Sequence, residues 1–374
     1  MSDIADFSKG IGISKDQLSA DGEPCILYGE LYTKYKYETI KEVISKTNID
    51  NTKLVKSKAN DVIIPCSGET AEEIATARCV LKDDILLGGD LNIIRLHGYD
   101  GSFMSYQLNG KRKYDIAKVA QGVSVVHLYG EHLKNIKTIN PSLNEQKKIA
   151  NLLSLLDERI STQNKIIEDL KKLKSAISKQ VFAQEPNGWS RLDTLFSKGK
   201  AGGTPTSTNK EYYNGEIPFL SINDITKQGK YVRYTENHLS QSGLENSSAW
   251  VVPKYSLIMS MYASVGLVTI NEIPITTSQA MFAMQLKDKD LLDYLYYYLS
   301  YFKYRHIHKY LETGTQSNIN ADIVRGIMIP TYGHSRNMEI ASTLQGIDVK
   351  IDNELSVLKL FNRQKNYLLS QMFI

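Results

Sequence analysis

The pattern of apolar residues in the middle of the chain predicts one long helix. Residues 143–182 contain neither glycine nor proline. Starting at Ile149, apolar side chains recur there at alternating steps of four and three residues. This spacing puts them on one narrow stripe, as in the seam of a coiled coil rather than the broader face of a globular helix. At 1.5 Å per residue the helix would reach up to about 60 Å, so we expect it to need a partner helix.

The end of the chain repeats the same pattern. Adding 191 to each seam position of the first helix gives a second seam. Its two polar interruptions, Glu354 and Lys365, correspond to Gln163 and Lys174 in the first helix. Two unrelated amphipathic helices would not share a register and its interruptions, so the pattern predicts an internal duplication. The expected seam residues are Ile149, Leu153, Leu156, Ile160, Ile167, Leu170, Ile177, Val181, Ile340, Leu344, Ile347, Ile351, Leu358, Phe361, Leu368 and Met372.

Short apolar runs bounded by turn residues precede each long helix and predict two strand-rich modules. Expected strands lie at 25–28, 62–64, 85–87, 92–96 and 123–128, and then at 217–222, 256–261 and 266–270. Shorter helices are expected at 39–45 and 290–311. The result is an α+β fold in which two mixed globular modules alternate with two long helices. The expected domains are 1–142, 143–185, 186–335 and 336–374.

A tyrosine-rich stretch at 294–310 interleaves aromatic and basic residues, as nucleic-acid binders do. Helical spacing nevertheless places several of its apolar residues on one side, and we expect these to pack in the core: Leu291, Leu295, Tyr298 and Phe302. The basic residues that follow face either a phosphate or water: Arg305, His306, His308 and Lys309.

Composition limits the class of protein. The chain has 374 residues, of which 42% are hydrophobic, enough for two or three globular cores. It lacks an 18-residue apolar run and a signal-peptide pattern, so we expect a cytoplasmic protein with no membrane partner. Its three cysteines, Cys25, Cys66 and Cys79, lack Cys-x-x-Cys spacing and are expected to be buried free thiols. The net charge of +4 gives only weak support for nucleic-acid binding.

The sequence contains no recognisable catalytic constellation. Neither a phosphate-binding loop nor a dinucleotide-binding glycine motif is present. No serine occupies a Gly-x-Ser-x-Gly turn, and His306 and His308 lack the thiols or paired carboxylates of a metal site. We therefore expect no catalytic residue, no metal, no cofactor and no small-molecule substrate in this chain.

Several short strings occur in a specific order around the two helices. They are NEQKKIA at 144–150, GGTP at 202–205, IPFLSIND at 217–224, TSQA at 277–280 and GTQSNIN at 314–320. In this order, the chain resembles the DNA-specificity (HsdS) subunit of type I restriction-modification systems over essentially its full length. The resemblance implies that each module is a target-recognition domain for one half of a split DNA site. It also implies that the long helices pair as an antiparallel coiled coil.

The same resemblance implies the partners. Double-stranded DNA, two methyltransferase subunits and restriction or translocase subunits would bind the chain. S-adenosylmethionine, ATP and Mg would be used only by those partner subunits. Half-site readers on one face of a duplex sit about 34 Å apart, so we expect an asymmetric bipartite site with an unread spacer.

Base and phosphate contacts need amide, hydroxyl, aromatic or basic groups on loops and strand ends. The candidates in the first module are Lys9, Lys15, Tyr28, Tyr32, Lys34, Tyr35, Asn92, Arg95, Lys111, Arg112 and Tyr114. Those in the second module are Lys198, Lys200, Thr204, Asn223, Tyr262, Ser264, Gln279, Gln316 and Asn318.

Two other classes of function remain as alternatives. The weak basic charge favours a coiled-coil adaptor whose two recognition modules bind proteins or peptides and not DNA. A free-standing nuclease or methyltransferase is disfavoured because no active-site motif can be assembled. Salt dependence separates the first alternative from DNA binding, since affinity for DNA falls with a slope of about −0.9 per neutralised phosphate.

Overall fold

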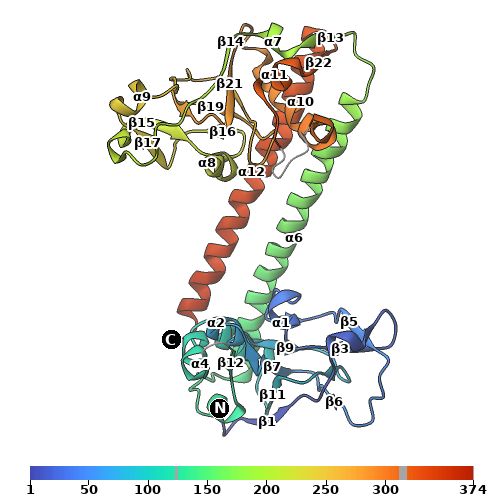
Figure 1. Cartoon of the computed structure of the whole chain (residues 1–374). Coiled ribbons are helices and arrows are strands. Elements are labelled where there is room, and N and C mark those ends of the chain that lie inside the picture. The colour runs from blue at the N-terminus through green and yellow to red at the C-terminus, as the bar shows by residue number, and fades with distance from the viewer. Residues whose placement is uncertain (123–124, 311–317, 374) are drawn as a thin grey trace. The chain divides into compact units, whose positions relative to one another are not determined.

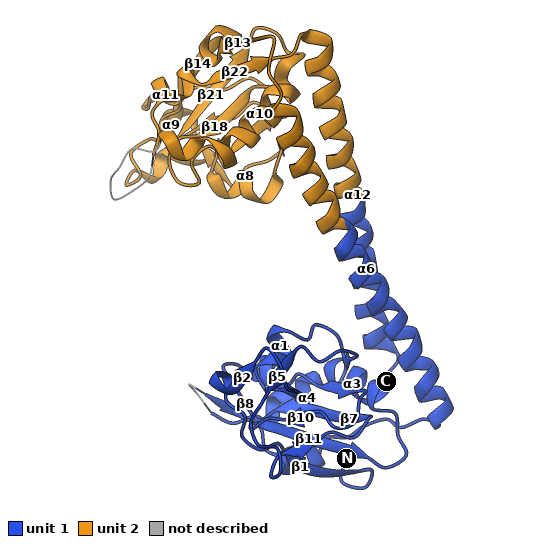
Figure 2. Ribbon diagram, turned by 90° about the vertical axis from the view of Figure 1, so that its right-hand side faces the viewer, with its two compact units in different colours: residues 1–166, 354–374 blue, residues 167–353 orange. Residues whose placement is uncertain are grey.

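The computed structural model describes residues 1–122, 125–310 and 318–373 (Figure 1). The chain forms two compact units (Figure 2). One comprises residues 1–166 and 354–374, and the other residues 167–353. Each unit contains a globular head and a stretch of both long helices. We call residues 1–142 the first head and residues 183–333 the second head.

The first head is built on two five-stranded sheets. One sheet has the order β1 (Ala5–Lys9), β11 (Leu91–Leu96), β7 (Asp61–Pro65), β9 (Arg78–Val80) and β4 (Thr39–Ile40). The other has the order β2 (Leu18–Ser19), β5 (Ser45–Thr47), β3 (Glu23–Ile26), β10 (Leu86–Leu87) and β6 (Val55–Lys56). A short pair joins β8 (Ser67–Gly68) to β12 (Val126–His127). The helices are η1 (Lys15–Gln17), α1 (Glu30–Thr33), α2 (Ala71–Ile74), α3 (Gly101–Asn109), α4 (Lys113–Val119) and α5 (Gly130–Lys134).

The second head contains a five-stranded sheet like the first sheet of the first head. In place of the other five-stranded sheet it has a smaller sheet. Its five-stranded sheet has the order β14 (Phe196–Ala201), β21 (Met281–Leu286), β18 (Leu257–Ser260), β19 (Val268–Asn271) and β16 (Tyr231–Val232). Beside it lies a three-stranded sheet of β17 (Asn237–Leu239), β15 (Tyr213–Leu220) and β20 (Thr276–Thr277). A further pair joins β13 (Gly188–Arg191) to β22 (Met328–Thr331). The helices are α7 (Leu192–Leu195), η2 (Lys210–Tyr212), α8 (Ile222–Gln228), α9 (Gln241–Glu245), α10 (Leu291–Arg305), η3 (Ile307–Tyr310) and α11 (Ala321–Gly326).

The repeated sheet has the same strand directions in both heads. The first strand is antiparallel to the second, as in β1 with β11 and β14 with β21. The last strand is parallel to its neighbour, as in β4 with β9 and β16 with β19. This agreement confirms the internal duplication. The second sheets differ in strand number, so the heads diverge mainly outside the repeated sheet.

The expected helix over 143–182 is confirmed as α6 (Leu143–Phe182). Ser142 and Glu145 form a reciprocal capping pair at its start, because each side chain accepts a hydrogen bond from the other residue's backbone N–H. The second long helix, α12 (His334–Gln371), begins two residues before the expected position 336. All the expected seam residues are buried or partly buried. Within the first unit, the Gln163 amide donates to the Glu354 carbonyl at 3.1 Å, so two corresponding interruptions of the seam meet.

The expected helix at 39–45 is wrong. Thr39–Ile40 forms strand β4 beside β9, and Ser45 begins β5. Ile40 is 2% exposed and packs in the core, and β-branched residues suit such a buried strand. Tertiary packing therefore overrides the local pattern here. Of the run at 123–128, only Val126–His127 is a strand, and residues 123–124 lie outside the described residues.

The aromatic helix of the second head packs as expected. Leu295, Tyr298 and Phe302 are buried, and Leu291 is partly buried against the same core. Tyr294 and Tyr297 join them. The three cysteines are buried and free, which confirms that prediction. In the described part of the chain, no helix combines the length and the apolar character needed to cross a membrane.

Candidate nucleic-acid interface

Three loops of the second head meet at one edge of its five-stranded sheet. They are residues 202–205 after β14, residues 261–266 after β18 and residues 278–280 before β21. Backbone hydrogen bonds connect them: the Gly202 N–H donates to Met281, and the Met261 N–H donates to Ala280. The Ile319 N–H also donates to Met261, which places Asn318 beside this edge. We call this edge the loop edge of the second head.

The glycines at 202 and 203 allow the loop edge to close. A Cβ on Gly202 would lie 1.9 Å from the carbonyl oxygen of Thr277. A Cβ on Gly203 would lie 2.3 Å from the hydroxyl oxygen of Ser248. Neither approach is possible for a residue with a side chain. The close packing lets the Thr204 hydroxyl donate to the side-chain oxygen of Gln279, so two sequence-predicted DNA contacts are neighbours.

Basic and aromatic side chains flank the loop edge. The Lys198 ammonium lies 4.3 Å from the ring centroid of Trp250, an arrangement in which the ring's negative face attracts the cation. The Lys200 ammonium donates to the Ser248 carbonyl at 3.4 Å. The Trp250 indole N–H is buried and has no hydrogen-bond partner among the described residues. Exposed Tyr262, Ser264 and Gln279 complete a surface that combines cations, a π-face and hydrogen-bonding groups.

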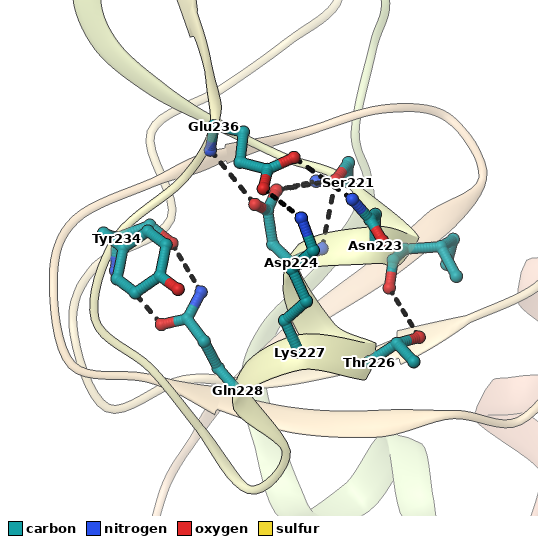
Figure 3. A network of polar contacts seen from close by, with 9 residues as sticks. Ser221, Asn223, Asp224, Thr226, Lys227, Gln228, Tyr234 and Glu236 are labelled. Carbon is teal, nitrogen blue, oxygen red and sulfur yellow. Dashed lines mark hydrogen bonds and ion pairs between the residues drawn. The ribbon is translucent and has the colours of Figure 1, made fainter. Parts of the chain in front are cut away.

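Asn223 lies in a separate polar network at the start of α8 (Figure 3). Ser221 and the buried Asp224 cap this helix reciprocally. The other carboxylate oxygen of Asp224 accepts from the Glu236 N–H at 3.0 Å. The exposed Asn223 amide donates to the Glu236 carboxylate at 3.1 Å, and Lys227 pairs with the same carboxylate. Asn223 thus lies beside an anion, whose charge disfavours a phosphate contact at this position.

The corresponding edge of the first head carries a similar combination. Lys9 ends β1, and its ammonium lies 5.5 Å from the ring centroid of Tyr129. Tyr129 is 45% exposed and contacts the rings of His127 and His132, with centroids 6.3 and 5.6 Å away. The sequence-based candidates did not include Tyr129 or the histidines. The signal available for them was the alternation of His127 and Tyr129 around the buried Leu128.

Several candidates of the first head form contacts that stabilise the fold. Asn92 is 1% exposed, and its amide donates to the Leu128 carbonyl at 3.0 Å. Tyr35 is 7% exposed and packs in the core. Lys34 pairs with Glu30 at 2.5 Å, and Arg95 pairs with the buried Asp61 through two hydrogen bonds of 2.9 and 2.7 Å. Asn92 and Tyr35 are therefore held in structural roles, and they offer almost no exposed surface to a ligand.

The remaining first-head candidates differ in their surroundings. Tyr32 lines a pocket of about 530 Å³ whose charged lining consists of three glutamates and Lys113, so its net charge opposes a phosphate. The glutamates are Glu69, Glu72 and Glu73. Arg112 pairs with Asp115 at 3.4 Å. Tyr28 is partly buried and contributes to the raised pKa of Tyr32, of which burial is the larger cause. Lys15 and Tyr114 are exposed. Lys111 is also exposed, and Gln316 of the second head lies outside the described residues.

The described residues contain no group of three or more His, Cys, Asp or Glu side chains that could hold a metal ion. His306 packs its ring against those of Tyr301 and Phe302, with centroids 5.8 and 5.6 Å away. Burial lowers the pKa of His306, and neighbouring cations lower it further. This histidine therefore belongs to the edge of the aromatic core.

Comparison with known proteins identifies the repeated unit. The family model described as the type I restriction modification DNA specificity domain matches residues 1–172 and again residues 186–358. The specificity subunit of the type I restriction enzyme MjaVIII from Methanocaldococcus jannaschii is 28% identical over 234 residues, which cover 62% of this chain and 51% of that protein. The MjaIX specificity subunit of the same organism is 27% identical over 158 residues, 41% of this chain and 36% of the relative. The matched regions thus span about a third to a half of these relatives.

Solved structures support the fold. The type I restriction-modification S subunit from M. genitalium superimposes with a TM-score of 0.63 at 17% identity, covering 100% of this chain and 94% of that one. A second structure, from a study of complex assembly and conformational transition in the type I R-M system, gives a TM-score of 0.62 at 16% identity. It covers 98% of this chain and 95% of that one. With two matching domains along most of its length, the chain belongs to the family of type I restriction-modification specificity subunits.

Proposed function

We propose that this chain is a non-catalytic DNA-reading subunit that directs a type I restriction-modification complex to an asymmetric, bipartite site. The observation that supports this most is that both heads place lysines of the first sheet strand beside an aromatic ring. Lys9 lies over Tyr129 in the first head, and Lys198 lies over Trp250 in the second. Lysine neutralises phosphates, and an aromatic face or an amide contacts bases.

Each head would read one half of the site. In the second head, the loop edge supplies Thr204, Tyr262 and Gln279 as hydrogen-bonding groups, with Lys198 and Lys200 as phosphate partners. In the first head, Lys9 and Tyr129 occupy the corresponding edge. The side chains differ between the heads although the sheet is the same, which favours two different half-site sequences. We propose that an unread spacer separates them.

The long helices supply a surface for partner subunits. Outside the seam, α6 carries Leu152, Leu155, Ile166 and Leu173, which are 39–50% exposed. On α12, Val349, Leu355, Val357 and Leu360 are 37–63% exposed. Apolar residues on the outer faces of paired helices are typical of an interface that another subunit covers. We propose that methyltransferase subunits bind there, that restriction subunits join through them, and that S-adenosylmethionine, ATP and Mg are bound only by these partners.

The protein-binding adaptor remains the second candidate, favoured by the net charge of +4. Binding to a duplex of known sequence at rising salt concentrations separates the two functions. A DNA reader loses affinity with a slope of about −0.9 per phosphate contact. A protein-binding adaptor shows no steep salt dependence toward DNA and no preference for one sequence.

A further inference from the structure

A buried polar network connects the first head to both long helices. The Tyr106 hydroxyl of α3 donates to the Asp157 carboxylate of α6 at 2.7 Å. The Lys365 ammonium of α12 pairs with the other Asp157 oxygen, also at 2.7 Å. Tyr106 is 0% exposed and Asp157 is 5% exposed. One hydroxyl, one carboxylate and one ammonium thus join three separate elements.

The second unit contains the same network at positions 191 residues away. The Tyr297 hydroxyl of α10 donates to the Asp348 carboxylate of α12 at 2.8 Å. The Lys174 ammonium of α6 pairs with the other Asp348 oxygen at 2.5 Å. Adding 191 converts Tyr106 to Tyr297, Asp157 to Asp348 and Lys174 to Lys365. We call each set of three residues a joint.

The two helices exchange roles between the joints. In the first unit α6 supplies the aspartate and α12 the lysine, whereas in the second unit α12 supplies the aspartate and α6 the lysine. Each head is therefore attached to both helices at once. A shift of either helix along the other would separate each carboxylate from its ammonium. The cost is larger in the first unit, where Asp157 is buried, because in the second unit the side chains of Asp348 and Lys174 are 24% and 28% exposed.

Other charged residues surround each joint, and these are not repeated. In the first unit, Lys365 pairs with Glu38 at 2.7 Å, and the charges of Glu38 and Asp157 act on the buried Arg78. In the second unit, Lys230 pairs with Asp293 at 2.6 Å and donates to the Tyr297 hydroxyl at 3.0 Å. Together with these neighbours, each joint balances two cations with two carboxylates, but the neighbouring residues of the head differ between the units.

We infer that the residues of each joint are the positioning residues that hold their own head in one orientation on its stretch of the two helices, and that losing them relaxes the preference for one spacer length. This inference rests on the proposed function. Adding one base pair to the spacer moves a half-site by about 3.4 Å and rotates it by about a tenth of a turn. A head held by an intact joint adapts to such a change less readily than a head whose joint is broken. The residues of the joints are positioning residues that touch no base.

The test uses the full chain in complex with its methyltransferase and duplexes carrying its methylated motif. Three duplexes are compared: one with the natural spacer, one with a spacer one base pair shorter and one with a spacer one base pair longer. We expect wild type to lose about tenfold or more in affinity for either altered spacer, comparable to one mismatched base pair. Lys365→Gln and the milder Tyr106→Phe should reduce that preference to about twofold or less. Both variants should still discriminate against base changes within each half-site.

Lys359→Gln, at an exposed position of the same helix, is the matched control and should keep the wild-type spacer preference. Unchanged spacer preference in folded Lys365→Gln and Tyr106→Phe would overturn the inference. If Lys365→Gln fails to fold, Tyr106→Phe decides alone, because it keeps the ring and the ion pair. Absence of any methylated motif that depends on the wild-type chain would instead overturn the proposed function.

Discussion

At the scale of single residues, the pairing of Lys198 with Trp250 is the most specific feature of the second head's surface. Lys198→Ala should weaken DNA binding for all sequences and lower the magnitude of the salt slope by about 1, because one phosphate contact is lost. Equilibrium binding to the methylated duplex at several salt concentrations measures both effects. Lys289→Ala, at an exposed position of the same head, should leave the slope unchanged. An unchanged slope in Lys198→Ala would show that this lysine does not contact a phosphate.

The buried thiols give a pH dependence with a definite sign. Burial raises the pKa of Cys25 and Cys66 to about 11 and that of Cys79 to about 12. In the unfolded chain these groups titrate near pH 8.5. Because the folded pKa values are raised, this contribution to stability is complete below about pH 8.5 and is lost as the pH rises toward 11.

Denaturant unfolding at pH 7.5, 9 and 10 tests this expectation. The free energy of unfolding should fall across the series, and substitution of the three cysteines by alanine should reduce the fall. A thiol reagent at pH 8 should react slowly with the native protein and fully after unfolding. Rapid reaction of all three native thiols would contradict their burial.

Some single-residue roles could not be predicted from the sequence. Asn92 follows a turn, as a base-contacting residue on a loop would. Its amide instead donates a hydrogen bond to the backbone carbonyl of Leu128, which lies 36 residues away along the chain. The sequence did not point to Tyr129 for a similar reason. Its neighbour in space, Lys9, lies 120 residues earlier in the chain. By contrast, Thr204 and Gln279 were predicted singly, and the structure brings them together.

At the scale of elements, the loop after β14 depends on its two glycines. Gly202→Ala should destabilise the second head by about 1–3 kcal/mol, because the new methyl would overlap a backbone oxygen that cannot move away freely. Thermal or denaturant unfolding measures the loss. Gly326→Ala is the control, since a Cβ there meets nothing within 4 Å. Equal stability of Gly202→Ala and wild type would show that the loop packs differently.

The outer face of α6 gives a second prediction at this scale. Leu155 is 50% exposed. Leu155→Asp should prevent co-purification with the methyltransferase, because a charge would be buried in the interface, while the helical circular dichroism signal stays unchanged. Thr162→Asp places the same charge at another exposed position of α6 and tests whether any added charge disrupts binding. An intact complex with Leu155→Asp would place the docking surface elsewhere.

Helical periodicity was the most informative sequence signal among the elements. The seam predicted α6, its duplicate and the residues that pack between them, since a narrow stripe of apolar residues has only one way to be buried. The segment at 39–45 was predicted wrongly because a few residues carry too little periodicity to separate a helix from a buried strand. Lys174 and Lys365 were noticed only as interruptions of the seam. Their partners Asp348 and Asp157 became apparent only in three dimensions.

At the scale of the whole molecule, a duplicated chain provides two related heads with different side chains. A symmetric dimer would read two identical half-sites, whereas a fused duplication lets each head diverge separately. The different second sheets are consistent with such divergence. Exchange of residues 186–335 for the corresponding module of a relative should therefore change only one half of the recognised site. A change in both halves would contradict independent reading by the two heads.

The central claim is that this chain directs methylation to a bipartite site. The most direct measurement is single-base methylation mapping across the genome, in cells that carry the chain with its methyltransferase and in cells that lack this chain alone. We predict that a split motif with a fixed, unread spacer is methylated in the first cells and unmethylated in the second. Identical methylation in both would contradict the account and favour the protein-binding adaptor.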